Sequence, residues 1–458
     1  MNDISRRGFL KGTAGLAGVA MLGGIIEACA TPAPGSPSAT SSAGASPGRG
    51  TPTPGSATLR FWHIWGGTRT ELLEGVLKDF EAKNPGTTVE PRLLSFDQSI
   101  TEQLTALAAK DVPELSQGYP VNVPQFIASG GLVSLSPYLE RDKIVLADIL
   151  NPSEVALATT NGSVYTLPMT ANGTSNNMFY NRALFESAGL DPDSPPRTWD
   201  ELKSAALKLT KRDGNRISQN GITILSSNPL VSDYKSWLIA NGGEWLSADG
   251  KTATFVKGLE TLEWIFDFAE SVYGGWENIA ATGTQQEEVT WTNFYSGLEA
   301  MYVAGPWYSF LVQSNAPDVF KSMGVALRPS NGTDKIGAAI GDGAGLWMLA
   351  GNKNPDAAWE LMKYLTIGEG GYSFLKAQKR PSPVKAVNEN PDFAQGDPFF
   401  PMYIAGQQKE VALPRTTVNA KLDEELKQML ETALFKRASV EDAFNRAVEN
   451  SQRILDES

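Results

Sequence analysis

The sequence predicts an α/β protein with two lobes. Its 458 residues exceed the length of one small domain, and 41% hydrophobic against 20% charged residues is typical of a globular chain with a full core. From residue 58 onward, a strand pattern, an amphipathic helix pattern and a second strand pattern follow one another. Because a β-α-β order implies a parallel sheet with helices on its faces, the fold class is α/β.

The N-terminus is expected to be a targeting segment and not part of the fold. Ser5 to Lys11 reads SRRGFLK, which is typical of a twin-arginine export signal. The apolar run that follows, from Gly12 to Ile26, is too short and too rich in glycine to predict a membrane span. Residues 1–28 are therefore predicted to be a signal peptide.

A lipid anchor is predicted at Cys29, the only cysteine of the chain. Ile26 to Cys29 resembles the bacterial lipobox, in which the cysteine is acylated, although Glu27 departs from the usual small or apolar residue. The next residues are Pro, Ser, Thr, Gly and Ala with one charge, at Arg49. Since such a composition cannot bury a core, 29–57 is expected to be a disordered tether at the outer face of the cell membrane.

The folded part is predicted to open with a buried strand at 58–65, which is rich in β-branched and aromatic residues. Gly66-Gly67 ends this strand. Thr68 and Glu71 have the spacing of a capping box, and a helical stripe follows at Leu72, Leu73, Val76, Leu77 and Phe80.

Three further elements continue the first lobe. Residues 87–94 predict a second strand, 100–110 a helix, and 112–115 leads into a third strand. The loop 116–120 is expected at the carboxyl end of that strand, where ligands bind in open α/β sheets.

Helix boundaries are marked most clearly between residues 180 and 209. Asn181 is a predicted N-cap, Gly189 a predicted left-handed stop, and Thr198 with Glu201 a second capping box. Later elements are predicted as strands at 221–225, 301–303 and 323–327, a strand returning across a hinge within 336–350, and helices at 232–241, 259–269, 294–300, from Pro355, 417–435 and 439–455.

The same stretch resembles the central signature of the solute-binding proteins of ABC importers. The group meant includes the maltose-binding and glycerol-3-phosphate-binding proteins, and the resemblance covers roughly residues 59 to 455. The residues that carry it are Tyr180-Asn181, Leu184-Phe185, Ala188-Gly189-Leu190, Pro196 and Thr198-Trp199-Asp200-Glu201-Leu202.

The resemblance implies a two-lobe periplasmic-binding-protein-like fold of type II with a ligand cleft between the lobes. Lobe 1 is expected at 58–168 plus 342–398 and lobe 2 at 169–341 plus 399–458. Hinge closure around the ligand would give a membrane permease a shape to recognise. A monomer without enzymatic activity and without a cofactor is expected.

Aromatic residues near strand ends are the main indication of the ligand, because Trp and Tyr stack on the flat faces of sugar rings. Each of them has packing in the core as its alternative role, to which Trp199 and Trp359 are assigned. Trp307 is the strongest candidate, since Gly305-Pro306-Trp307 resembles the family segment whose Trp stacks on sugar. The other aromatic candidates are Trp62, Trp65, Tyr119, Tyr234, Trp237 and Trp347.

Polar candidates would fix the hydroxyl groups of a carbohydrate. His63 is either a ligand contact or a hydrogen-bonded histidine at a strand end, and Gly67 either receives a hydroxyl or phosphate or forms a tight turn. The remaining polar candidates are Gln117, Asn172, Asp342 and Arg380.

Several other functions are disfavoured by composition. A formal net charge of −12 argues against nucleic acid, and one His with one Cys cannot build a Cys/His zinc site. No phosphate-binding GxxxxGK[ST] motif occurs. The open alternatives to a mono- or oligosaccharide are a glycerol phosphate ester, with Arg380 as the cationic clamp, and a secreted glycosidase, which would need two facing carboxylates.

Overall fold

The computed structural model describes residues 57–95, 98–171, 176–214, 216–226, 230–282, 292–341, 343–394 and 396–458. These residues belong to one compact unit. The predicted signal peptide, the tether with Cys29, and the candidates Asn172 and Asp342 lie outside the described residues.

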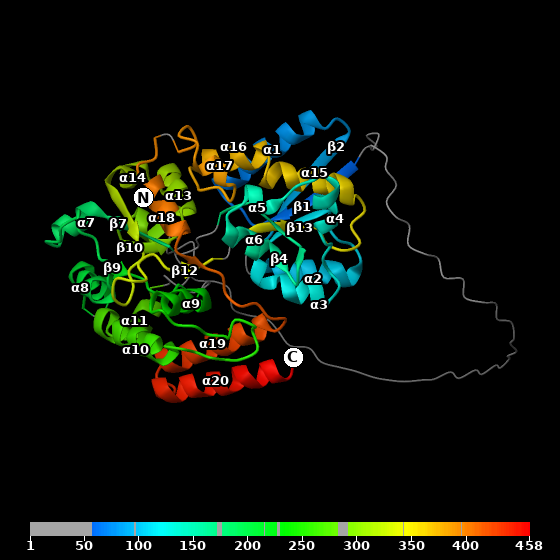
Figure 1. Cartoon of the computed structure of the whole chain (residues 1–458). Helices are drawn as coiled ribbons and strands as arrows, with labels where there is room; N and C mark the ends of the chain where they lie inside the picture. Colours follow the sequence, from blue (N-terminus) through cyan, green and yellow to red (C-terminus); the bar gives the residue numbers. More distant parts are fainter. Residues whose placement is uncertain are drawn as a thin grey trace, which may run out of the picture. The chain divides into compact units, whose positions relative to one another are not determined.

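The first sheet has the strand order β2-β1-β3-β13-β6. Strand β1 (Ala57–His63) pairs in parallel with β2 (Thr87–Leu93) and β3 (Leu115–Gly118), whereas β13 (Gly345–Trp347) runs antiparallel to β3 and to β6 (Leu167–Pro168). The predicted β-α-β opening is therefore confirmed. We call the part of the chain built on this sheet the first lobe; Figure 1 shows it in blue and cyan with yellow helices.

The second sheet has the order β11-β7-β10-β9-β8. Strand β7 (Asn177–Asn181) is antiparallel to β10 (Glu299–Ala304) and β11 (Met323–Leu327), while β10 is parallel to β9 (Arg216–Ile222). Strand β8 (Lys211–Asp213) closes the edge. We call the part built on this sheet the second lobe; its helices are green and red in Figure 1.

Two short strand pairs lie outside these sheets. One is β4 (Thr159–Thr160) with β5 (Ser163–Val164), and the other is β12 (Ala339–Ile340) with β14 (Glu410–Val411). The single strand predicted within 336–350 is thus two short strands, β12 and β13, in different sheets. Glycine at 345 permits this path, because a Cβ there would lie 2.2 Å from Oγ1 of Thr166.

Helices cover both sheets. Up to residue 158 they are α1 (Thr68–Lys83), α2 (Ser99–Ala109), α3 (Val123–Ala128), α4 (Ser136–Arg141), α5 (Leu146–Ile149) and α6 (Pro152–Ala158). Between 182 and 322 they are α7 (Arg182–Ser187), α8 (Trp199–Leu209), α9 (Leu230–Ala240), α10 (Gly258–Phe268), α11 (Trp276–Ala280), α13 (Trp307–Asn315) and α14 (Pro317–Ser322). The last ones are α15 (Pro355–Thr366), α16 (Glu369–Ala377), α17 (Lys385–Asn388), α18 (Phe400–Gln407), α19 (Asn419–Leu434) and α20 (Val440–Asp456).

The two predicted capping boxes have different outcomes. At α8 the backbone N–H of Glu201 donates to Oγ1 of Thr198 (3.3 Å) and the N–H of Thr198 donates to Oε2 of Glu201 (3.1 Å), so this box is confirmed. The box at Thr68 is wrong, since Gly67 occupies the N-cap and Thr68 is already helical. Gly67 has φ 64°, which a glycine adopts without strain, and this turn starts α1 one residue early.

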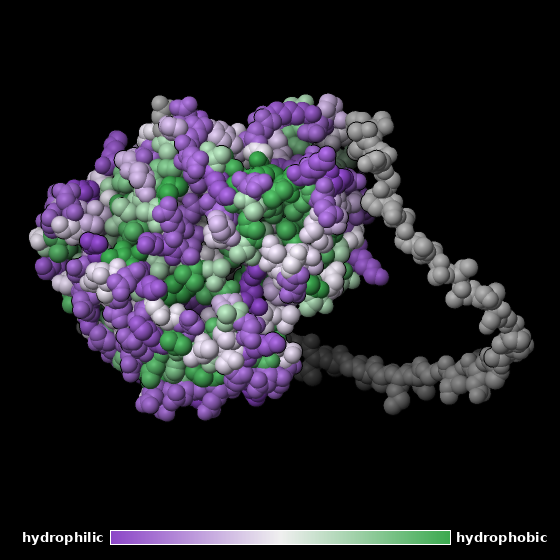
Figure 2. All heavy atoms as spheres, in the orientation of Figure 1, coloured by the Kyte–Doolittle hydropathy of each residue, from purple (hydrophilic) through white to green (hydrophobic). Residues whose placement is uncertain are grey.

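Two large apolar clusters hold the fold. One joins the second sheet to α8, α9, α10, α19 and α20. The other runs from β1 and α1 of the first lobe to aromatic residues of the second, including Phe179, Tyr308 and Tyr403. Hydrophilic side chains cover most of the face shown in Figure 2, with an apolar patch in the region of α5. None of the helices in the described ranges is long and apolar enough to cross a bilayer.

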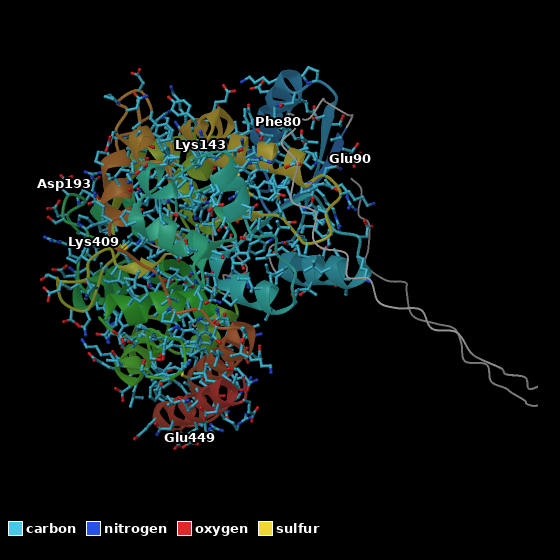
Figure 3. All side chains as sticks on the ribbon, turned by 45° about the vertical axis from the view of Figure 1, so that its right-hand side comes forward. Phe80, Glu90, Lys143, Asp193, Lys409 and Glu449 are labelled. Carbon is cyan, nitrogen blue, oxygen red and sulfur yellow. The ribbon has the colours of Figure 1, made fainter. Side chains whose placement is uncertain are left out.

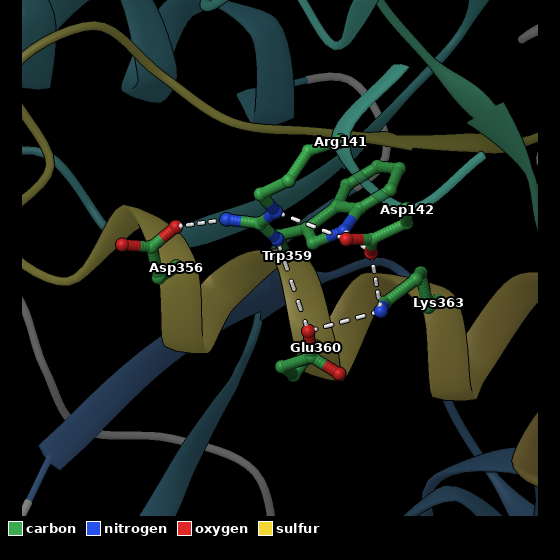
Figure 4. A network of polar contacts seen from close by, with 6 residues as sticks. All are labelled: Arg141, Asp142, Asp356, Trp359, Glu360 and Lys363. Atoms are coloured by element: carbon green, nitrogen blue, oxygen red, sulfur yellow. Dashed lines mark hydrogen bonds and ion pairs between the residues drawn. The ribbon is translucent and has the colours of Figure 1, made fainter. Parts of the chain in front are cut away.

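A polar network fixes α4 against α15 in the first lobe (Figure 4). Asp142 accepts hydrogen bonds from Nε1 of Trp359 (2.7 Å), Nζ of Lys363 (2.6 Å) and Nε of Arg141 (2.9 Å). Burial raises the pKa of Asp142, but these three hydrogen bonds outweigh it and hold the pKa well below its ordinary value. Trp359 is fully buried, as its predicted packing role requires.

Replacing Asp142→Asn is expected to destabilise the protein by about 1–3 kcal/mol at pH 7, because Arg141 and Lys363 lose a half-buried charged acceptor. The folded pKa is lowered, so the stabilisation is complete above the ordinary carboxyl pKa of about 3.9 and is lost only as the pH falls through the lower folded value. Urea unfolding at pH 7 measures the difference. The exposed Asp148→Asn on α5 is the control, and equal midpoints for the two variants would contradict the prediction.

Candidate functional site

Charged side chains from distant parts of the chain converge on one place. We call Arg69, Tyr119, Glu154, Arg380 and Glu410 the polar cluster. The pKa of Arg380 is lowered to about 10 by burial and by the charge of Arg69, against the opposite influence of the other three members. All four other members thus contribute to the electrostatic environment of the Arg380 guanidinium.

The fold explains how these side chains meet. Arg69 lies in the first turn of α1, directly after β1, and Tyr119 directly follows β3. Because β1 and β3 are parallel neighbours, their carboxyl ends share one edge of the sheet, the edge at which open α/β sheets bind ligands. Glu154 comes from α6, and Arg380 follows α16.

Glu410 lies on β14, which pairs with β12. Both of its carboxylate oxygens are buried and have no hydrogen-bond partner among the described residues. Burial and the neighbouring Glu154 raise the pKa of Glu410 well above its ordinary value, although Arg380 opposes them. A carboxylate in this position gains stability from any group that donates hydrogen bonds to it.

Arg380 is likewise a buried charged residue with a polar atom that has no partner among the described residues. Its side chain is only 7% exposed, and its Nε has no partner in the described part of the chain. The Nε2 of Gln117, another predicted site residue, is likewise buried without a partner. Buried polar atoms are normally hydrogen-bonded, so a group of such atoms beside one another is typical of a ligand site.

Two aromatic side chains lie beside the polar cluster. The guanidinium of Arg69 is 5.9 Å from the centre of the Trp307 ring, which is half-buried at the start of α13. The hydroxyl of Tyr295 is buried without a described partner, and burial raises its pKa while Arg69 opposes this. Of the predicted set, Trp307 thus lies beside Arg69, and Tyr119 and Arg380 belong to the polar cluster.

His63 and Trp65 lie at the edge of this region but are buried. Burial and then Arg69 lower the pKa of His63 to about 4, so its ring is neutral at pH 7. Its Nδ1 accepts from the backbone N–H of Trp65 (3.3 Å). Trp65 itself is 3% exposed and packs on Phe374 with ring centres 5.2 Å apart.

Three predicted aromatic contacts are located in the interior instead. Tyr234 donates to the carbonyl of Gly258 (3.1 Å), Trp237 to that of Ile224 (2.7 Å), and Trp347 to Oε1 of Gln103 (2.8 Å). Their side chains are fully buried. Since their polar atoms are satisfied within the protein, we assign all three to packing, in contrast to the expectation of a ligand contact.

Three further candidates differ from the expected position. Trp62 is half-buried, and the guanidinium carbon of Arg92 lies 4.8 Å from the centre of the Trp62 ring. Trp62 packs against a separate apolar cluster that contains Trp347. Gly67 is exposed and forms the turn before α1. Gln117 also lies within β3 and not in the loop predicted after it.

Sequence reasoning missed Arg69, Glu154, Tyr295 and Glu410. Nothing local distinguishes them, except that Arg69 follows the Gly66-Gly67 turn. Two cavities of the described chain lie elsewhere, one between α9 and residues 411–414 and one beside α7 and α8. No group of three His, Cys, Asp or Glu side chains in the described ranges could hold a metal ion.

The family of the protein follows from sequence comparison. Residues 66–366 match the model for bacterial extracellular solute-binding proteins, and the chain belongs to this family. Residues 3–23 match a twin-arginine translocation signal, which together with the family indicates export. Both sequence predictions are thereby confirmed.

Individual relatives agree with this assignment. A putative binding protein of Brucella abortus (strain 2308) is 27% identical over 346 residues, 72% of this chain and 78% of the relative. The sn-glycerol-3-phosphate-binding periplasmic protein of Escherichia coli (strain K12) is 25% identical over 154 residues, 33% of this chain and 35% of that protein.

A solved structure confirms the fold. The ABC transporter solute-binding protein of Thermotoga lettingae TMO, bound with α-D-tagatose, is 28% identical and has a TM-score of 0.76. The alignment covers 87% of this chain and 100% of that one. The predicted two-lobe α/β class is correct.

The interior position of Tyr234 gives a test. Tyr234→Phe removes the hydroxyl that bonds Gly258 and is expected to reduce the free energy of unfolding by about 1 kcal/mol while ligand affinity stays unchanged. Urea unfolding and ligand titration measure the two effects. A loss of affinity with unchanged stability would return Tyr234 to the ligand site.

Proposed function

We propose that the protein is the substrate-binding lipoprotein of an ABC importer and that it captures a mono- or oligosaccharide between its lobes. The observation that carries this is the position of Trp307 beside Arg69 of the polar cluster, in which both carboxylate oxygens of Glu410 and the Nε of Arg380 are buried without a partner among the described residues. Such a combination suits a sugar, whose ring offers a flat face and whose rim offers hydroxyls. The tagatose-bound relative supports the same ligand class.

The predicted lobe boundaries, 58–168 plus 342–398 and 169–341 plus 399–458, belong to this proposal. Ligand binding closes the lobes by hinge bending, and the closed form is recognised by the membrane permease. The protein acts as a monomer and catalyses no reaction. Hydrolysis of chromogenic glycosides by the purified protein would overturn the proposal that it catalyses no reaction and would favour a glycosidase.

A glycerol phosphate ester is the second candidate ligand. It is supported by the resemblance to the Escherichia coli glycerol-phosphate binder and by Arg380, a buried cation able to meet a phosphate. Against it stands the absence of a surplus of cations in the polar cluster, where the acidic Glu154 and Glu410 accompany Arg69 and Arg380.

A thermal-shift screen of the exported protein against neutral sugars, polyols and sn-glycerol 3-phosphate tests the ligand class. A ligand that binds only the folded state stabilises it by about 2.7 kcal/mol at a hundred times its Kd. We expect a shift with one class of sugar. The absence of a shift with every sugar would contradict the proposal.

Trp307→Ala is expected to weaken sugar binding by about 2 kcal/mol, about thirtyfold, because a central aromatic anchor is lost. Isothermal titration measures the change. Trp264→Ala, in the second lobe, is the matched control, since Trp264 stacks on Trp199 with ring centres 4.0 Å apart. Equal affinities for the two variants would remove Trp307 from the site.

The lipid anchor is testable in a bacterium with a twin-arginine export system. Cys29→Ser should move the exported protein from the membrane fraction to the soluble fraction, because no acyl chain can be attached. Replacing Arg6 and Arg7 with Lys is the export control and should leave the precursor inside the cell. Membrane retention of the Cys29→Ser protein would contradict acylation at this residue.

A further inference from the structure

We propose that the cavity between α9 and residues 411–414 is a second binding site, which takes a small uncharged ring compound whose one hydrogen-bond acceptor pairs with the indole N–H of Trp245. This site is separate from the polar cluster. Val411 lines the cavity whereas Glu410 belongs to the polar cluster, and successive side chains of a strand point to opposite sides. Lys409, which directly precedes β14, lies on the surface in Figure 3.

The size and the lining of the cavity define the shape of its occupant. The cavity has a volume of about 190 Å³. Four of its lining residues are apolar and at most 5% exposed, namely Leu238, Ile239, Trp245 and Leu246. Ala248 also lines it and is exposed, so the cavity is accessible from the solvent. Since an apolar cavity of about 150 Å³ stays dry and binds benzene, this one has room for a benzene ring with a small substituent.

The charges around the cavity indicate an uncharged occupant. Among the lining residues, Lys235 and Glu244 carry a charge. Lys235 is buried and its Nζ donates to the carboxylate of Asp423, so its charge is already neutralised within the protein. Glu244 is exposed to water. A charged molecule would therefore lose its hydration in the cavity without gaining an unpaired charge of opposite sign.

Trp245 supplies the one polar contact that we assign to the occupant. Its Nε1 is buried and has no acceptor among the described residues, and an indole N–H can only donate. The surroundings fix this side chain: the Nζ of Lys235 lies 3.7 Å from the centre of its ring, and the backbone N–H of Phe255 donates to its carbonyl (3.3 Å). An occupant with one carbonyl group would satisfy a donor that otherwise stays unpaired at a cost in free energy.

Three probes of similar size test the class of the occupant by NMR titration of the exported protein. Acetophenone and ethylbenzene share a ring and a two-carbon side chain and differ in one carbonyl group, whereas benzoate carries a negative charge. We expect the wild type to bind acetophenone and ethylbenzene but not benzoate. A wild type that does not bind acetophenone, or that binds benzoate more tightly than acetophenone, would overturn the inference.

A matched pair of variants tests the location of the site. Ala248→Trp places a large side chain at an exposed position of the cavity lining, and we expect it to weaken both neutral probes about tenfold or more, because it takes up the space that the ring needs. Ala281→Trp is the control, since Ala281 is also exposed and lies at the end of α11, outside the lining. Equal affinities of the two variants would show that the probes bind elsewhere and would overturn the inference.

Trp245→Phe tests the hydrogen bond. It keeps an aromatic ring but removes the N–H, so we expect the affinity for acetophenone to fall by about 3- to 10-fold relative to that for ethylbenzene. An equal change for the two probes would overturn the role of Trp245. Because the two affinities are compared within one variant, a general loss of stability does not produce this result, and a melting curve confirms that each variant is folded. None of these measurements depends on the proposed sugar.

Discussion

The burial of charge at the polar cluster is the constraint on which the functional arrangement depends. Arg380 and the carboxylate oxygens of Glu410 are withdrawn from water, and each side chain keeps polar atoms that no described residue satisfies. Such burial is unfavourable on its own, so the rest of the fold has to maintain it. The apolar cluster that runs from β1 and α1 to Phe179 and Tyr403 supplies that stability and extends across both lobes.

Hydrogen bonds to main-chain carbonyls also join the two lobes. Arg415 of the second lobe donates to the carbonyls of Leu157 (2.9 Å) and Thr159 (2.7 Å) at the end of α6. Asn419 donates to the carbonyl of Val121 (2.9 Å), just beyond Tyr119. The segments that carry Glu154 and Tyr119 are thus held by the second lobe, which links the geometry of the polar cluster to the position of the lobes.

Aromatic residues near strand ends divide into two groups by their burial. Trp347 fills the space over Gly118, where a Cβ would lie 1.9 Å from its ring, and its Nε1 bonds to Gln103. Trp307 instead lies half-buried beside Arg69. The same residue type at similar positions in the pattern therefore has either a packing role or a place in the site, and only the surroundings distinguish them.

The sequence by itself determined the fold class, the export signal and most elements, because these depend on local periodicity, caps and turns, as the box at Thr198 and the left-handed Gly189 illustrate. It also named Arg380, Gln117 and Trp307 as candidate ligand contacts. The tertiary structure decided the rest: it added Arg69, Glu154 and Glu410 to the candidates and showed Tyr234, Trp237 and Trp347 buried with their polar atoms hydrogen-bonded. The physical reason is that burial and hydrogen-bond satisfaction arise between segments far apart in the chain, such as β14 and α6, whose proximity no local pattern encodes.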